Sequence, residues 1–157
     1  MKNILCSIVL IVLIISLSGC MGDKEISSSI NIPNINDYTV LYIQSVDKNG
    51  AASESTSKYI TDKNEIETFI KKVNKMEVIK PSNKKFINKS KELNKQGNYM
   101  IVLSDSKKMD HEMYSMIFYE DGSIHFESED ENKIIYVSKK KHPSLLKELK
   151  SDFHVTF

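Results

Sequence analysis

A histidine flanked by two carboxylates is the arrangement in this sequence that could bind a metal ion. Asp110, His111 and Glu112 are consecutive, and imidazole and carboxylate groups are common metal ligands. Adjacent side chains of a strand point to opposite faces, so these three groups can converge only in a loop. The chain has no H-E-x-x-H motif and no second histidine at ligand spacing. We therefore interpret the three residues as a solvated loop, keep metal binding as the alternative, and expect no cofactor.

A second acidic cluster lies close to residue 130. It lacks the D-x-D-x-D-G spacing and the distal glutamate of an EF-hand calcium loop, so a charged hairpin tip is the better interpretation. His125 and His142, on either side of the cluster, are interpreted as ordinary residues of a strand and of a helix start. The acidic residues are Glu127, Glu129, Asp130 and Glu131.

The sequence contains no recognisable motif for nucleophilic catalysis. There is no G-x-S-x-G motif, and the five glycines are scattered singly, so no phosphate-binding glycine loop is predicted. The two cysteines, Cys6 and Cys20, both lie near the N-terminus, which leaves no thiol nucleophile in the rest of the chain. The residues therefore favour a protein that is not an enzyme.

The N-terminus has the three parts of a secretory signal peptide. Lys2 precedes a hydrophobic run over residues 4–17, and two small residues follow. A membrane-spanning helix needs about 20 mostly apolar residues, and this run is shorter. We predict a cleaved signal peptide over residues 1–19, with a short uncleaved anchor as the alternative.

Leu17-Ser18-Gly19-Cys20 resembles the lipobox of bacterial lipoproteins, in which small residues precede an invariant cysteine. The resemblance implies that the signal peptide is cut before Cys20 and that its sulfur carries a diacylglyceryl group. It also implies a location on the outer face of the cell membrane. Two acyl chains suffice for stable anchoring, because each buried methylene contributes about 0.8 kcal/mol.

The predicted mature chain has two parts. Residues 20–37 are polar, rich in serine and asparagine, and contain Pro33, so we predict the lipidated cysteine followed by a flexible tether. Residues 38–157 are predicted to form a single domain, long enough to bury its own core. With Cys6 removed and Cys20 lipidated, no disulfide can form within the mature chain, and packing alone must stabilise it.

Composition bears on the partners of this chain. All 22 basic side chains are lysine, against 21 acidic ones, and the chain has no tryptophan. Removal of residues 1–19 takes away one lysine, so the predicted mature chain is formally neutral. Arginine is the usual residue for bidentate phosphate recognition, and a neutral exported chain without it argues against nucleic acid as a partner. The expected partners are the lipid bilayer, through Cys20, and a protein of the cell envelope.

The first half of the predicted domain combines short strands with one clear helix. Asp62 and Glu65 form a capping-box pair, and an apolar stripe follows at helical spacing. The lysine-rich residues 82–97 are predicted to be a long loop with at most one helical turn. Strands are predicted over 38–46, 58–61 and 77–80, and the helical stripe comprises Ile66, Phe69, Ile70 and Val73.

The second half is strongly β-forming and ends in a helix. Four runs of strand-forming residues, within 98–139, suggest an antiparallel meander, and Asp121-Gly122 favours a type I′ hairpin turn. Pro143 suits a helix start. The expected fold class is α+β: an antiparallel sheet of about five to seven strands with two helices packed on one face. The apolar stripe of the last helix comprises Leu145, Leu146, Leu149 and Phe153.

Tyrosines are concentrated in the predicted meander. Alternation along residues 114–119 puts large side chains on both faces of the sheet. The second face is therefore either core, covered by the lysine-rich segment, or a contact surface for a partner. The tyrosines concerned are Tyr99, Tyr114, Tyr119 and Tyr136.

The order of elements, a capped helix followed by the "YSMIFYEDGSIHF" hairpin, resembles small lipoproteins of Gram-positive bacteria such as the YhfM-like proteins. This resemblance implies no site residues. We expect a membrane-anchored, non-catalytic binding or accessory module. The alternative is an envelope hydrolase or metal-binding protein whose site is assembled from residues distant in sequence.

Overall fold

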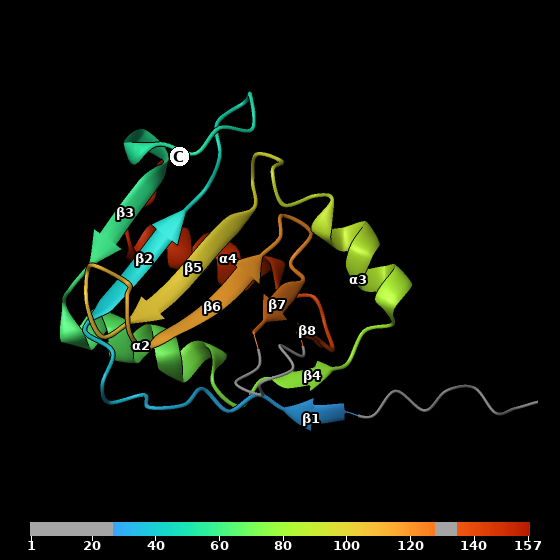
Figure 1. Ribbon diagram of the computed structural model, residues 1–157, viewed down its shortest axis with the longest axis horizontal. Coiled ribbons are helices and arrows are strands. Elements are labelled where there is room, and N and C mark those ends of the chain that lie inside the picture. The colour runs from blue at the N-terminus through green and yellow to red at the C-terminus, as the bar shows by residue number, and fades with distance from the viewer. Residues whose placement is uncertain (1–26, 128–134) are drawn as a thin grey trace, which may run out of the picture.

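A single antiparallel sheet organises residues 27–127 and 135–157, which are the residues that the computed structural model describes (Figure 1). The expected α+β class is confirmed, but the described chain has eight strands and three α-helices, more than predicted. The strand order is β1-β4-β8-β7-β6-β5-β2-β3. The strands are β1 (Ser27–Ser29), β2 (Val40–Gln44), β3 (Ser57–Ile60), β4 (Glu77–Ile79), β5 (Tyr99–Ser104), β6 (Met113–Phe118), β7 (Ile124–Phe126) and β8 (Tyr136–Ser138).

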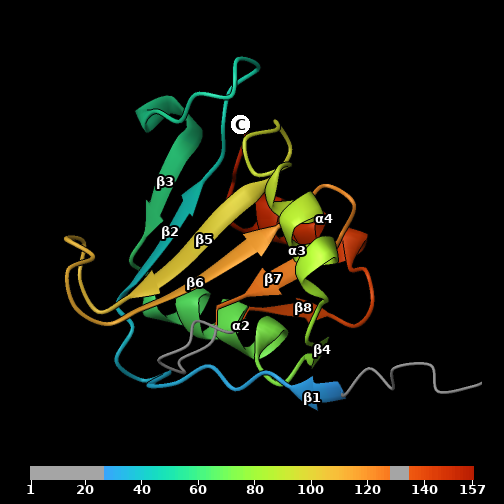
Figure 2. The ribbon, with the colours of Figure 1, turned by 45° about the vertical axis from the view of Figure 1, so that its right-hand side comes forward.

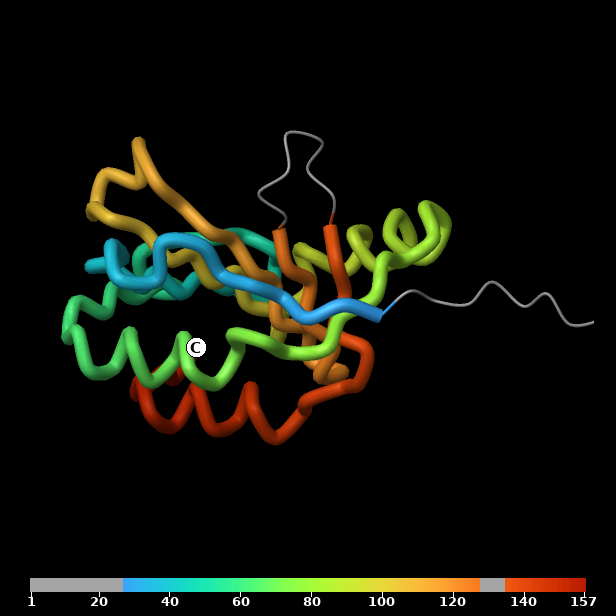
Figure 3. Tube along the Cα trace, turned by 90° about the horizontal axis from the view of Figure 1, so that it is seen from below, coloured from blue at the N-terminus to red at the C-terminus, as the bar shows by residue number. Residues whose placement is uncertain are grey.

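Helices lie on both faces of the sheet. α2 (Lys63–Val73) and α4 (Pro143–Asp152) lie side by side on one face, and α3 (Asn83–Ser90) lies on the opposite face (Figures 1 and 3). The main core fills the layer between the sheet and the helix pair. There the Phe69 ring lies 6.3 Å from the Phe118 ring and 6.2 Å from the Phe153 ring. A short 3-10 helix, η1 (Glu54–Thr56), precedes β3.

Local sequence explains α2 well. The Asp62 carboxylate accepts hydrogen bonds from the backbone N–H groups of Asn64 (2.9 Å) and Glu65 (3.1 Å), and so caps the helix. All four residues of the predicted apolar stripe are buried. The outer face carries the Glu67–Lys71 pair, at 3.8 Å, which contributes little because both side chains are exposed. Burial of the stripe against the sheet is therefore what stabilises this helix.

Residues 27–37, expected to be part of the tether, lie in the folded unit instead. Ser27–Ser29 pairs with β4 as an edge strand of the sheet. Ile30 and Ile32 are 6% and 2% exposed and belong to the core. The Ile32 N–H donates to Asn74 Oδ1 at 3.0 Å. The prediction failed because two isoleucines separated by one polar residue give no sustained periodicity, although both are buried in the core.

The lysine-rich segment, predicted to be mostly loop, contains α3. Ser82 caps the helix by accepting a hydrogen bond from the Lys85 N–H (3.4 Å). No residue of α3 is fully buried. Its sequence, NKKFINKS, lacks the sustained apolar stripe from which a helix is predicted. Contacts of Phe86 and Lys89 with the sheet, described below, hold the helix in place.

Strands β5 to β8 form the predicted antiparallel meander. In the turn between β6 and β7, the Gly122 N–H donates to the Tyr119 carbonyl at 2.8 Å. The type I′ prediction is wrong: Gly122 has a φ of 84°, but neither Glu120 nor Asp121 has a positive φ, and type I′ requires it at both central residues. The predicted hairpin tip at 128–132 lies outside the described residues.

Candidate functional site

The second face of the sheet, opposite α2 and α4, has a covered half and an open half. α3 lies over β6 and β7, in the middle of the strand order, whereas no helix of the described chain lies over the edge formed by β2 and β3 (Figure 2). Strand register defines which side chains share the face. One row runs through Gln44, Met100, Ile117 and His125. The neighbouring row runs through Tyr59, Tyr42, Val102 and Ser115.

In the covered half, His125 lies between two aromatic rings. Phe86 of α3 stacks on the imidazole with ring centres 5.9 Å apart, and Tyr119 meets it edge-on at 4.8 Å. The Tyr119 hydroxyl lies 3.4 Å from His125 Nδ1. Burial, reinforced by the nearby Lys89 charge, lowers the pKa of His125 to about 4. The imidazole is therefore neutral at pH 7.

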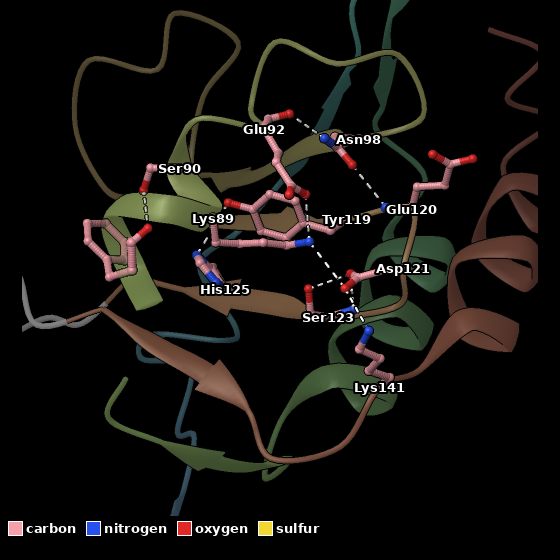
Figure 4. Close-up of polar contacts among 11 residues, drawn as sticks. Lys89, Ser90, Glu92, Asn98, Tyr119, Glu120, Asp121, Ser123, His125 and Lys141 are labelled. Atoms are coloured by element: carbon pink, nitrogen blue, oxygen red, sulfur yellow. Dashed lines mark hydrogen bonds and ion pairs between the residues drawn. The ribbon is translucent and has the colours of Figure 1, made fainter. Parts of the chain in front are cut away.

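Lys89 connects α3 to the turn between β6 and β7. Its ammonium group lies 4.4 Å from the centre of the Tyr119 ring, 2.8 Å from Glu92 Oε2 and 3.2 Å from Asp121 Oδ2 (Figure 4). The hydrogen bond from Lys89 lowers the pKa of Glu92. One lysine thus combines a cation–π contact with two ion pairs, and its side chain is only 21% exposed.

Asp121 is the acidic centre of the same turn. It accepts hydrogen bonds from the Ser123 hydroxyl (2.6 Å) and from the Ser123 N–H (3.1 Å), and it pairs with Lys141 at 2.9 Å. Burial raises the pKa of Asp121, but the bonds from Ser123, Lys141 and Lys89 outweigh this effect and hold it well below its usual range. The charged carboxylate therefore joins α3, the turn and the segment that leads into α4.

Asn98 completes this polar cluster. Its side-chain nitrogen donates to the Glu92 carbonyl (2.5 Å), and its side-chain oxygen accepts from the Glu120 N–H (2.9 Å). Burial raises the pKa of Tyr119 to about 12, so its hydroxyl stays protonated. The groups satisfy one another, and Phe86 covers the His125 ring. This geometry fixes α3 on the sheet.

The open half has a different character. It consists of Tyr42, Gln44, Tyr59, Met100 and Met113, on β2, β3, β5 and β6. The Tyr42 and Tyr59 rings lie 4.7 Å apart, and Gln44 Nε2 donates to the Tyr42 hydroxyl at 2.9 Å. Tyr59, Met100 and Met113 are 47%, 39% and 49% exposed. Tyrosine and methionine are residue types enriched at protein contact surfaces.

The predicted metal ligands lie in the connection between β5 and β6, where each is engaged separately. Asp110 accepts a serine hydroxyl at 3.2 Å, and Glu112 accepts the side-chain amide of Asn34 at 2.7 Å. His111 Nδ1 lies 3.9 Å from the Asp105 carboxylate. Among the described residues, no group of three histidine, cysteine or acidic side chains is arranged to hold a metal ion.

Other predicted positions are dispersed or undescribed. Glu127 directly follows β7, whereas Glu129, Asp130, Glu131 and Cys20 lie outside the described residues. His142 is the N-cap residue of α4, but its side chain makes no capping hydrogen bond.

The tyrosine-rich surface predicted from the meander is mainly core. Tyr99 and Tyr114 are both 3% exposed and face α2 and α4, and Tyr119 is 1% exposed beneath α3. Tyr136 is half-buried. The pair of half-buried Tyr42 and exposed Tyr59 was missed. A hairpin register that sets them opposite each other would have been the signal.

No helix of the described chain is both long enough and apolar enough to cross a membrane. Comparison with known proteins gave no match to any protein-family model, to any curated protein or to any solved structure.

Proposed function

We propose that this chain is a lipid-anchored, non-catalytic binding module on the outer face of the cell membrane, and that the open half of its sheet contacts a protein of the envelope. The anchor is the diacylglyceryl group on Cys20, inferred from the lipobox of residues 17–20. The observation that carries the binding proposal is the presence of three exposed side chains, Tyr59, Met100 and Met113, on one face of the sheet.

The physical support is the cost of leaving apolar surface in water. Each square ångström of apolar surface that a partner covers contributes about 25 cal/mol, and tyrosine and methionine are enriched at protein contact surfaces. Met100 and Met113 have flexible, polarizable side chains that adapt to a partner. The Gln44–Tyr42 hydrogen bond adds a polar group that can select among partners.

The short N-terminal segment supports a position close to the membrane. Ser27, the first residue of β1, is seven positions after Cys20, so a fully extended chain between them spans at most about 25 Å. A module held this close meets partners in or near the same membrane.

Metabolic labelling tests the anchor. Cells that produce the full chain are grown with radioactive palmitate, and we expect the protein to be labelled and processed. Cys20→Ser is expected to be unprocessed and unlabelled, because the lipid-accepting thiol is gone. Label that persists in Cys20→Ser would contradict the assignment.

Site-specific photocrosslinking in cells tests the binding surface. A benzophenone amino acid placed at Tyr59 or Met100 is expected to give a discrete adduct of higher mass. The matched control is the same amino acid at Glu67, on the outer face of α2, where no adduct is expected. Absence of adducts at both sheet positions, or equal adducts at Glu67, would refute the open half as the contact surface.

A further inference from the structure

A pocket of about 480 Å³ lies between the end of α2, the start of β4 and the start of α4, within the size range of small-molecule sites. Backbone contacts hold its walls: the Lys139 N–H donates to the Glu77 carbonyl (2.9 Å), and the His142 N–H donates to the Gly122 carbonyl (2.6 Å). A Cβ at Gly122 would lie 2.5 Å from the Pro143 nitrogen. Glycine is therefore needed there for α4 to begin beside the pocket.

Lysine dominates the charge of this pocket. Lys72, Lys75, Lys140 and His142 line it, and Glu77 is its acidic residue. Glu77 pairs with Lys139 at 3.3 Å, and Lys72 pairs with two carboxylates of α4 at 2.5 and 2.8 Å. These five groups carry one net negative charge, so Lys75 and Lys140 leave the surroundings of the pocket with one net positive charge. Within the described chain, the ammonium groups of Lys75 and Lys140 have no carboxylate partner.

Two further features add to the character of the pocket. The first turn of α4 contains no acidic residue, so the positive end of the helix dipole is not offset there. Met76 and Leu145 also line the pocket and give it an apolar wall. The pocket thus combines two ammonium groups that have no carboxylate partner within the described chain with a surface that suits a short carbon chain.

We infer that this pocket binds a phosphate group, either as free phosphate or as the phosphate ester of a lipid headgroup. Lysine binds phosphate as a point charge with three hydrogen-bond donors, and Lys75 and Lys140 supply this from two different segments. Met76 and Leu145 would contact the carbon part of an ester. The site is separate from the open half of the sheet and goes beyond the proposed binding function.

The position of the pocket favours a lipid headgroup as one source of the phosphate. The Lys75 N–H donates to the Ile30 carbonyl (2.8 Å), and the Ile30 N–H donates to the Met76 carbonyl (2.9 Å). The N-terminal segment therefore lies beside the pocket. Ile30 is ten residues from Cys20, which spans at most about 36 Å. The headgroup source rests on the proposed lipid anchor, whereas binding of free phosphate does not.

The test follows backbone amide resonances of the full chain in alkyl maltoside micelles, which contain no phosphate. Inorganic phosphate and glycerol 3-phosphate are titrated against chloride at equal ionic strength, and a second preparation contains phosphatidylglycerol. We expect saturable shifts at residues 74–77 and 140–146. The double variant Lys75→Gln/Lys140→Gln is expected to bind at least about tenfold more weakly, since a hydrogen bond to a charged group contributes about that factor. Lys107→Gln/Lys108→Gln, which loses the same charge in an exposed loop, is expected to bind normally.

Each outcome decides between the sources or rejects the site. Shifts with inorganic phosphate alone support a free-anion site, and shifts with glycerol 3-phosphate and phosphatidylglycerol support a headgroup site. Absence of saturable shifts with all three probes overturns the inference, as does equal weakening in the two double variants. Failure here leaves the photocrosslinking result at Tyr59 and Met100 unaffected, so the two proposals fail independently.

Discussion

Burial decides the charge state of His125, a residue that the sequence alone presents as an ordinary strand histidine. Its ring is 4% exposed, stacked under Phe86 and set edge-on against Tyr119. In this setting protonation would place a cation in a poorly solvated site close to Lys89, so the neutral form is favoured. Asp121 opposes this effect but does not outweigh it. The histidine therefore contributes to packing and makes the free energy of unfolding depend on pH.

Stability is expected to fall between pH 6.5 and pH 4 because of His125. The pKa of His125 is about 4 in the folded state and about 6.5 when unfolded. As pH falls through this range, the unfolded state binds a proton that the folded state does not, so the free energy of unfolding decreases. The slope from this one group is at most about 1.4 kcal/mol per pH unit, and it vanishes below the folded pKa. The measurement is the free energy of unfolding by urea across this pH range.

His125→Phe is the matched variant for that experiment. It keeps an aromatic ring between Phe86 and Tyr119 but does not titrate, so its stability is expected to vary less with pH between 6.5 and 4. Carboxylates such as Asp121 and Glu92, whose pKa values are lowered, contribute equally to both proteins. Parallel pH profiles for the two proteins would show that His125 does not titrate as described.

Among the secondary-structure elements, α3 depends most on tertiary contacts. It is an eight-residue helix with no fully buried side chain, and isolated helices of this length are not stable in water. Phe86 on His125 and Lys89 on Tyr119 attach it to the sheet. The helix in turn covers two residues, Tyr119 and His125, that would otherwise be exposed on the second face.

Phe86→Ala is expected to detach α3 and to cost about 1–3 kcal/mol of unfolding free energy, less than the 3–5 kcal/mol of a fully buried phenylalanine. Amide hydrogen exchange over residues 83–90 should accelerate, and the pKa of His125 should rise toward 6.5 because its cover is lost. Both are measurable by NMR. Ile87→Ala is the matched control in the same helix: Ile87 is 55% exposed, and its truncation should change stability by no more than about 0.5 kcal/mol. A rapidly exchanging α3 in Ile87→Ala, or an unchanged His125 pKa in Phe86→Ala, would contradict this account.

On the scale of the whole molecule, the sheet begins earlier in the chain than the composition of its N-terminal region indicates. β1 pairs with β4 at one edge of the sheet, while β2 lies near the other edge, next to β3. The segment that joins β1 to β2 carries Ile30 and Ile32 into the core beside α2. The folded unit thus starts within seven residues of Cys20, which limits how far an anchored protein could move from the membrane.

Ile32→Ala is expected to lower the free energy of unfolding by about 2–4 kcal/mol, because Ile32 is 2% exposed and its truncation leaves a cavity. Chemical denaturation of the full chain in detergent measures this. Ile35→Ala provides a control of the same residue type in the same segment: Ile35 is 39% exposed, so a change below about 0.5 kcal/mol is expected. Equal and small losses in both variants would mean that residues 27–37 are a tether after all.

Local signals in the sequence were enough for α2, for the start of α4 and for the meander of β5 to β8. Each of these has a cap, a helix-starting proline or a sustained apolar period, and such short-range preferences persist in the fold. The same signals were insufficient for β1 and α3. Each depends on contacts with residues distant in sequence: β1 pairs with β4, the Ile32 N–H that follows it donates to Asn74 Oδ1, and Phe86 of α3 stacks on His125.

The sequence by itself determined the α+β class and the two-helix layer, because these depend on periodicity. The processing site at Cys20 stays a prediction from one contiguous motif. Only the tertiary structure decided which tyrosines are core and which are exposed. Whether a tyrosine on the second face is buried depends on whether α3 covers it. Alternation of large residues along a strand assigns each side chain to a face, but it does not show which part of that face is covered. The pocket lined by Lys75 and Lys140 could also not be predicted from the sequence. The two lysines are far apart in the chain, and only the tertiary structure shows that α4 starts beside β4.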